Sequence, residues 1–314
     1  MPKCMLCSSV AAVKVPYLGG HLCSTHFSQY FERRFLETLE RLDMVRRGER
    51  VAVAVSGGKD SLTLLYLFSR YRRALGVELV AVAVDEGIKG YREYKLEAAK
   101  EYAEKWGVEL VIKSFKRAFG FTLDEAVAAL MRGGLRYKPC TLCGVLRRYL
   151  LNAAALELEA DKLATAHNMD DEAQAFLMNM VRANLKALSR EGPVSGKVHE
   201  KLVPRIKPLY FAPEREVTAY ALIQGIESPP VECPYIAYST RHIIRRWLNR
   251  VELGDRSVKY RVLALKELLK EALGGGVEEF KTCKVCGMPS SGDVCKACSL
   301  VAYVRPLLTN LFNE

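Results

Sequence analysis

The chain has 314 residues, of which 50% are hydrophobic and 26% are charged, and these proportions exclude a disordered protein. No apolar run approaches the roughly 18 residues of a membrane span. Cys4 and Cys7 interrupt the stretch where a signal peptide would lie, so we expect a cytoplasmic protein without a membrane partner. The formal net charge of +11 favours a polyanionic partner, although a basic soluble protein has the same balance.

Residues 1–28 contain four potential metal ligands, Cys4, Cys7, Cys23 and His26. A segment this short builds little core, and its ligand spacing is that of a zinc site, so we predict an N-terminal zinc finger. CxxC pairs without a secretory signal indicate metal rather than disulfides. A helix is predicted over 29–47, ended by Gly48.

Apolar runs and helical patterns then alternate along the chain. This alternation predicts an α/β fold, a Rossmann-like parallel sheet with helices on both faces. The predicted strands cover 51–55, 79–84, 108–112 and 162–165, and the helices cover 59–75, 92–106, 122–131, 146–158 and 170–188.

The rest of the chain is predicted to be helical, apart from an exposed loop at 191–201. Pro213 opens one helix, and two more cover 238–251 and 255–273. Three glycines at 274–276 form a flexible linker. A second metal set of four cysteines follows, so we predict three domains: a zinc finger at 1–28, a catalytic domain at 29–273 and a second zinc finger at 277–314. The second set is Cys283, Cys286, Cys295 and Cys298.

A glycine-rich turn follows the first strand and precedes a helix. Its residues are Ser56, Gly57, Gly58, Lys59, Asp60 and Ser61. Glycines let the backbone wrap around an anion, and the helix start offers free N–H groups, so we predict a site for ATP phosphates. Asp60 is a candidate ligand for the magnesium ion of ATP. The spacing differs from that of Walker A.

Two other strand ends carry polar residues. Ligands bind at the carboxyl ends of strands in open α/β sheets, so Val84 and Asp85 are expected to lie near the nucleoside. For Asp85, a turn or cap position is the competing interpretation. The segment 164–172 also ends a strand and opens a helix. Because adjacent helical residues point about 100° apart, Asp170 and Asp171 are expected to have different roles.

Cys140, Cys143 and Cys233 have no obvious fourth ligand. Three thiolates suit an iron–sulfur cluster with one open iron. Three alternatives remain: persulfide or disulfide chemistry, zinc with an open position, and buried structural cysteines. Downstream, Arg241, Arg245, Arg246 and Arg250 form a basic helical stripe that suits tRNA phosphates, or else a solvated face.

These motifs together resemble the TtuA/TtcA group of tRNA thiolation enzymes, in its TtuA-like branch with terminal zinc fingers. The phosphate loop resembles the PP-loop of ATP pyrophosphatases. The resemblance covers nearly the whole chain and implies ATP-dependent adenylation of the C2 oxygen of a tRNA uridine, followed by sulfur transfer that depends on a 4Fe-4S cluster. It implies a ubiquitin-like carrier with a C-terminal thiocarboxylate as sulfur donor.

The resemblance also implies roles by position. Cys140, Cys143 and Cys233 would hold the cluster, and Asp171 would be catalytic. Arg147 stands where relatives often have lysine, and an arginine suits an electrostatic role better than proton transfer. The ATP site would comprise Ala54, Ser56, Gly57, Gly58, Lys59, Asp60, Ser61, Val84, Arg147, Ala166 and Asp171.

The predicted cofactors are therefore the cluster, two zinc ions and ATP with magnesium, and the predicted partners are tRNA, the sulfur carrier and a second copy in a homodimer. A thermophile-like composition, rich in Arg, Glu, Leu, Val and Ala and poor in Asn and Gln, favours the T-loop 5-methyluridine at tRNA position 54 as target. The alternatives are the wobble uridine at position 34, a PP-loop amidating ligase that needs no cysteines, and an RNA-binding subunit with an inactive nucleotide fold.

Overall fold

The computed structural model describes residues 1–133, 136–273 and 280–312. The linker predicted at 274–276 lies outside the described residues. The helices are α1 (Ser24–Arg41), α2 (Lys59–Leu75), α3 (Arg92–Lys105), α4 (Phe115–Phe119), α5 (Leu123–Arg132), α6 (Pro139–Glu157), α7 (Met169–Val181), α8 (Leu185–Leu188), α9 (Glu214–Ile223), α10 (Thr240–Gly254), α11 (Val258–Leu273) and α12 (Lys296–Phe312).

A five-stranded sheet forms the centre of the molecule, in the order β5-β4-β3-β6-β7, with every pair of neighbours parallel. Its strands are β3 (Arg50–Ala54), β4 (Glu78–Asp85), β5 (Glu109–Ser114), β6 (Lys162–Ala164) and β7 (Arg205–Ile206). The chain runs outward from β3 to β5 and then returns to the other side of β3. The order of the strands therefore reverses between β3 and β6, and such a reversal is where open α/β sheets bind ligands.

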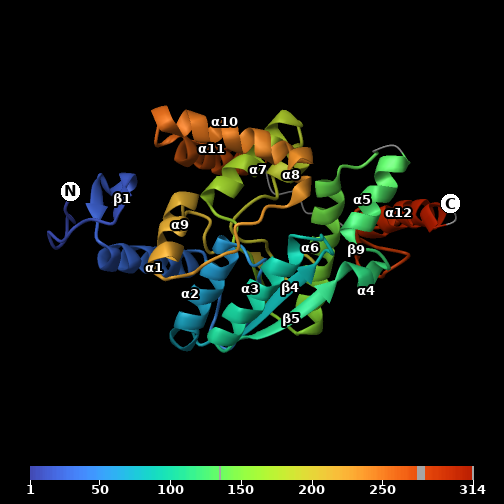
Figure 1. Cartoon of the computed structure of the whole chain (residues 1–314), viewed down its shortest axis with the longest axis horizontal. Helices are drawn as coiled ribbons and strands as arrows, with labels where there is room; N and C mark the ends of the chain where they lie inside the picture. Colours follow the sequence, from blue (N-terminus) through green and yellow to red (C-terminus); the bar gives the residue numbers. More distant parts are fainter. Residues whose placement is uncertain (134–135, 274–279, 313–314) are drawn as a thin grey trace.

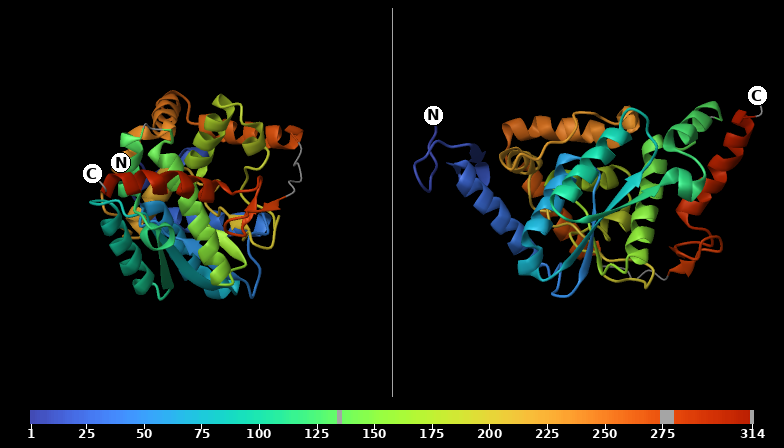
Figure 2. Two further views of the ribbon diagram at one scale, coloured as in Figure 1. Left: turned by 90° about the vertical axis from the view of Figure 1, so that its right-hand side faces the viewer. Right: turned by 60° about the horizontal axis from the view of Figure 1, so that its bottom comes forward.

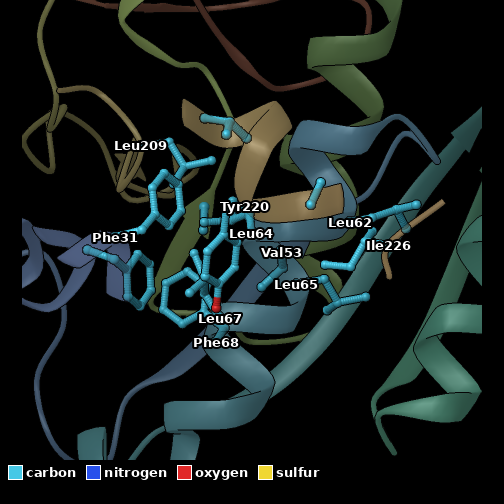
Figure 3. Packing of buried hydrophobic residues seen from close by; sticks show 14 of the residues in the cluster. Phe31, Val53, Leu62, Leu64, Leu65, Leu67, Phe68, Leu209, Tyr220 and Ile226 are labelled. Carbon is cyan, nitrogen blue, oxygen red and sulfur yellow. The ribbon is translucent and has the colours of Figure 1, made fainter. Parts of the chain in front are cut away.

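Alternate residues of β3 face opposite sides of the sheet. Val51 and Val53 pack with α1, α2 and α9, whereas Ala52 packs against Ala154 and Ala155 of α6. On the first side, Phe31 of α1 stacks on Tyr220 of α9, with 4.5 Å between the ring centroids (Figure 3). The predicted sheet with helices on both faces is confirmed.

Two short hairpins stand at the ends of the molecule. Strands β1 (Val13–Val15) and β2 (Gly20–Leu22) form the N-terminal one, and β8 (Lys281–Thr282) and β9 (Pro289–Ser290) precede α12. The N-terminal hairpin and α12 lie at opposite ends of the long axis (Figures 1 and 2). Helices α10 and α11 lie together on the side of the molecule that carries α7.

Three predicted helices have different bounds in the structure. Helix α1 starts at Ser24 and ends before Asp43, whose left-handed φ of 43° stops the helix well before Gly48. Helix α6 starts at Pro139 rather than 146, because proline suits a first helical position. The helix predicted over 170–188 is interrupted after α7 at Ala183, where φ is 50°. Two short 3-10 helices, Pro16–Leu18 and Pro234–Tyr238, were not predicted.

Candidate active site

A cavity of about 670 Å³ opens at the carboxyl ends of β3, β4 and β6. Its walls come from the glycine-rich turn after β3, the first turns of α6, the segment after β6, and the chain from Cys233 into α10. Most of the predicted site residues line it: Ala54, Ser56, Gly58, Asp60, Ser61, Val84, Cys140, Cys143, Arg147, Ala166, Asp171, Cys233 and Arg241. Gly57, Lys59, Arg245, Arg246 and Arg250 are outside this lining.

Hydrogen bonds of its own serines fix the conformation of the turn after β3. Ser61 Oγ accepts a hydrogen bond from Ser56 N at 3.0 Å and donates one to Gly58 O at 2.9 Å. Gly57 has a φ of +77°, and a Cβ added there would lie 1.9 Å from Lys95 O. Only glycine fits this close approach. Because Gly58 caps α2, the first N–H groups of that helix open toward the cavity.

Lys59 and Asp60 bind each other at the start of α2. Lys59 Nζ lies 2.9 Å from Asp60 Oδ2 and 3.0 Å from Glu214 Oε1. Burial opposes the charge of Lys59, but Asp60 and Glu214 together raise its pKa. Lys59 is therefore a cation that α9 holds at the edge of the cavity, while Asp60 itself reaches the lining.

Asn168 joins two of the acids that line the cavity, Asp60 and Asp171. It caps α7 together with Asp171, and its Nδ2 donates to Asp60 Oδ1 at 3.3 Å. Burial raises the pKa of Asp171, and Arg241, 2.9 Å away, counteracts that rise. Asp170 instead is buried, bonded to Lys259 and to the backbone N–H of Glu214. The two aspartates have different surroundings, as expected.

The three central thiols share one wall of the cavity. Cys140 and Cys143 lie in the first turns of α6, and Cys233 immediately precedes a 3-10 helix. Burial raises the pKa of all three thiols, that of Cys143 to about 12, so a bound metal would displace their protons. They are not among the described groups whose ligand atoms all lie within 4.8 Å of one another. Thiolates on one zinc ion lie within about 4.6 Å of each other, so the wider spacing fits a cluster better than a single ion.

The two terminal sets are compact, unlike the central one. In each, the four ligand atoms lie within 4.8 Å of one another. The sulfurs of Cys7 and Cys23 are 3.7 Å apart, and so are those of Cys286 and Cys295. Tetrahedral zinc with thiolate bonds of about 2.3 Å requires a separation of about 3.8 Å. Both sets fit a structural zinc ion.

The basic stripe of α10 divides into two halves. Arg241 pairs with Asp171, and Arg245 Nη2 lies 2.8 Å from Glu214 Oε1, so both bind acids on the cavity side. Arg246 and Arg250 are exposed. The sequence did not distinguish these halves because their partners are distant along the chain.

Comparisons with known proteins agree with this geometry. A family model described as a PP-loop domain matches residues 27–252. The tRNA-5-methyluridine(54) 2-sulfurtransferase of Pyrococcus horikoshii is 37% identical over 94% of this chain and 92% of its own. The chain belongs to the PP-loop family of tRNA thiolases. It lies in the TtuA-like branch.

Other thiolases extend this similarity. The structure of the U34-tRNA thiolase NcsA from Methanococcus maripaludis, with its 4Fe-4S cluster, matches with a TM-score of 0.83 at 34% identity, covering 97% of each chain. The tRNA 2-thiolation protein NcsA of Haloferax volcanii is 33% identical over 96% of this chain and 99% of its own. None of the described helices is long and apolar enough to cross a membrane.

Sequence reasoning missed several residues of the thiolase cavity. Glu86 and Arg92 are each 3% exposed and form an ion pair of 2.9 Å, and Arg92 Nη1 also donates to Ser56 O at 2.7 Å. Glu86 also lies 3.5 Å from Arg147. Asp85, the residue singled out by its strand end, instead accepts a hydrogen bond from Gly87 N and shapes a turn. The end of β4 therefore does supply an acid to the cavity, but this acid is Glu86, the residue after Asp85.

His167, Arg148 and Arg182 were also missed as lining residues. Burial lowers the pKa of His167 to about 3, so its ring is neutral and shares a hydrogen bond of 3.0 Å with Thr165. Arg148 follows Arg147 in α6, and Arg182 caps the end of α7. Both arginines are exposed at the cavity mouth.

Proposed function

We propose that this thiolase makes 2-thiouridine in tRNA, at the T-loop 5-methyluridine of position 54. The observation that carries the proposal is one cavity lined both by the phosphate loop and by three thiols. ATP activates the O2 oxygen of the uridine, and sulfur then adds to C2, the carbon that carries this oxygen. Both steps therefore require the same cavity. A PP-loop amidating ligase needs no such thiols.

The reaction requires two displacements. The uridine O2 attacks the α-phosphorus of ATP while the N3 proton leaves, which breaks the bond to the β-phosphate and releases pyrophosphate. A hydrosulfide sulfur then adds at C2, AMP departs with the former O2 oxygen, and the hydrosulfide proton passes to N3, which restores the N3–H of the product. No electrons are gained or lost overall, so the reaction needs sulfide but no reductant.

The chain's own residues prepare the first displacement. Ser56, Ser61 and the free N–H groups of α2 would bind phosphate oxygens, and Asp60 would hold the magnesium ion of ATP. Gly57 and Gly58 keep the loop close to the phosphates. Asp171 lies beside this loop, joined to Asp60 through Asn168. Arg147, held by Glu86, supplies positive charge where negative charge develops.

The second displacement depends on Cys140, Cys143 and Cys233. Their spacing supports cluster binding, and three cysteine ligands would leave one iron of a 4Fe-4S cluster free to bind the incoming sulfide. We propose structural zinc at both terminal sets, a thiocarboxylated carrier protein as sulfur donor, and a homodimer as a further prediction. The domain limits at 28, 273 and 277 remain predictions.

The proposal is tested by anaerobic incubation of the full chain, with its iron and sulfide restored, with ATP, magnesium, sulfide and a tRNA that carries 5-methyluridine 54 but no thiolation. Nuclease fragments are then analysed by mass spectrometry. We expect a gain of sulfur for oxygen in the T-loop fragment. Cys140→Ser should keep pyrophosphate release and lose sulfur insertion. Pyrophosphate release without sulfur in any fragment would contradict the proposal.

Position 34 is the second candidate, because the Methanococcus maripaludis relative is described as a U34-tRNA thiolase. The same fragment analysis separates the two targets. Sulfur in the anticodon fragment alone would assign the chain to the wobble position and would leave the chemistry unchanged.

A further inference from the structure

The mouth of the cavity has more cations than its carboxylates neutralise. Six cationic side chains line the cavity, against three carboxylates. Arg92 and Arg147 share Glu86, and Arg241 pairs with Asp171. Asp60 is bound to Lys59. The remaining lining cations, Lys138, Arg148 and Arg182, have no ion pair in the described part of the chain.

These three cations lie on two helices that line the cavity. Lys138 caps the start of α6, Arg148 lies further along the same helix, and Arg182 caps the end of α7. Arg182 donates a hydrogen bond of 3.5 Å to Thr240 Oγ1, which directs its guanidinium toward the start of α10. All three are exposed at the opening, whereas Ser61 of the phosphate loop is buried.

Among the described residues, Arg148 has no ion pair or hydrogen bond that explains its position. A cation at the end of a helix is favourable by itself, which accounts for Arg182 but not for Arg148 in the middle of α6. Partial desolvation in the cavity wall, followed by the nearby charges of Arg205, Arg147 and Arg241, lowers the pKa of Arg148 to about 10, although the side chain remains exposed. Both effects disfavour the charged form of Arg148, and a bound anion would offset them.

We propose that Lys138, Arg148 and Arg182 form a subsite for RNA phosphates next to the reacting uridine, in which Lys138 and Arg148, about 15 Å apart along α6, contact different phosphates. The inference rests on the proposed function. The uridine ring must reach between the phosphate loop and the three thiols, so its own backbone stays at the mouth, where these cations lie. A guanidinium binds two phosphate oxygens at once, which would fix how deeply the base enters.

A nucleotide phosphate has the same chemistry, so the experiment measures both ligands. Binding of an unmodified tRNA transcript to the full chain is followed over a range of salt concentrations, and ATP binding is measured separately. For Arg148→Ala we expect tRNA affinity about tenfold weaker at moderate salt, and a salt dependence shallower by about 0.7 to 0.9 in the log–log slope, as for one lost phosphate contact. ATP affinity should stay unchanged.

Matched variants control the test. Arg148→Lys should retain the salt slope and recover part of the affinity, because it keeps the charge but loses the planar fork. Arg73→Ala removes an exposed arginine about 20 Å along α2 from the phosphate loop and should change neither ligand. An unchanged tRNA slope in Arg148→Ala would overturn the proposal, and weakened ATP binding with that unchanged slope would assign the cations to the nucleotide.

Failure of the proposed function gives a different result. In that case the wild-type chain would form no 2-thiouridine, which is measured in the fragment analysis and not in the binding titration. Loss of the salt-slope effect in a chain that thiolates normally would overturn only the subsite.

Discussion

Arg241 Nη1 lies 2.9 Å from Asp171 Oδ1, so a helix that carries exposed arginines also holds a carboxylate of the ATP site. Four residues further along α10, Arg245 binds Glu214, which in turn binds Lys59. Helix α10 therefore contacts the first turns of both α7 and α9 through ion pairs.

Replacing Arg241 should change the pH dependence of catalysis. Burial raises the pKa of Asp171 and Arg241 opposes that rise, so Arg241→Gln raises the pKa further and reduces ionised Asp171 at a given pH. The acid limb of tRNA-dependent pyrophosphate release should move to higher pH. The pair is 37% and 31% exposed, so we expect the interaction to contribute about 1 kcal/mol, which corresponds to a shift of the acid limb by about 0.7 pH unit. Arg241→Lys should restore most of it. A higher KM for tRNA with an unshifted pH profile would contradict this role.

Replacing Gly57 by alanine should damage the phosphate loop. The added Cβ would lie 1.9 Å from Lys95 O, at a φ of +77°. We expect the free energy of unfolding to fall by about 3–5 kcal/mol and ATP binding to be lost. Gly90→Ala is the control, because Gly90 has a φ of +73° but no atom within 4 Å of the added Cβ, and should lose about 1–2 kcal/mol. Equal losses in urea unfolding would show that the contact with Lys95 is unimportant.

Neutralising Glu86 should leave the buried guanidinium of Arg92 without its carboxylate partner. Glu86 pairs with Arg92 at 2.9 Å, and both residues are 3% exposed. We expect Glu86→Gln to lower the free energy of unfolding by about 3–5 kcal/mol, and the double variant with Arg92→Met to lose less than the single one. Urea unfolding of the two single variants and the double variant measures this coupling. Strictly additive losses would contradict it.

Replacing a terminal cysteine should reduce the zinc content of the chain, whereas replacing a central cysteine should reduce its iron content. Cys283 is buried beside Leu300 and Val304 of α12, so Cys283→Ser should lose one zinc per chain and expose the amides of α12 to hydrogen exchange. Cys140→Ser should keep both zinc ions and lose iron. Metal analysis and hydrogen exchange of the two variants test this difference, and iron loss in Cys283→Ser with intact zinc would contradict it.

The sheet could be predicted from the sequence because its strands are buried on both faces. Val51, Ala52 and Val53 form a continuous apolar run, and such a run followed by a glycine-rich turn indicates both the strand and the ligand site. The metal sets could be predicted because their ligands lie close in sequence or keep a fixed CxxC spacing.

Long-range pairing could not be predicted in this way. The partners of Arg241 and Glu86 depend on how α10 and α6 pack, and no local pattern encodes that packing. The break after α7 depends on Ala183, whose left-handed backbone has no sequence signal of the kind glycine gives. The start of α6 at Pro139 had such a signal, the preference of proline for a first helical position, but the pattern of apolar residues was followed instead.

The central claim is that Cys140, Cys143 and Cys233 hold a cluster beside the phosphate loop. It is tested most directly by the zinc, iron and acid-labile sulfide content of the chain purified strictly without oxygen. The account predicts about two zinc, four iron and four sulfide per chain, with the iron lost in Cys140→Ser. Zinc alone, with no iron even after anaerobic reconstitution, would contradict it.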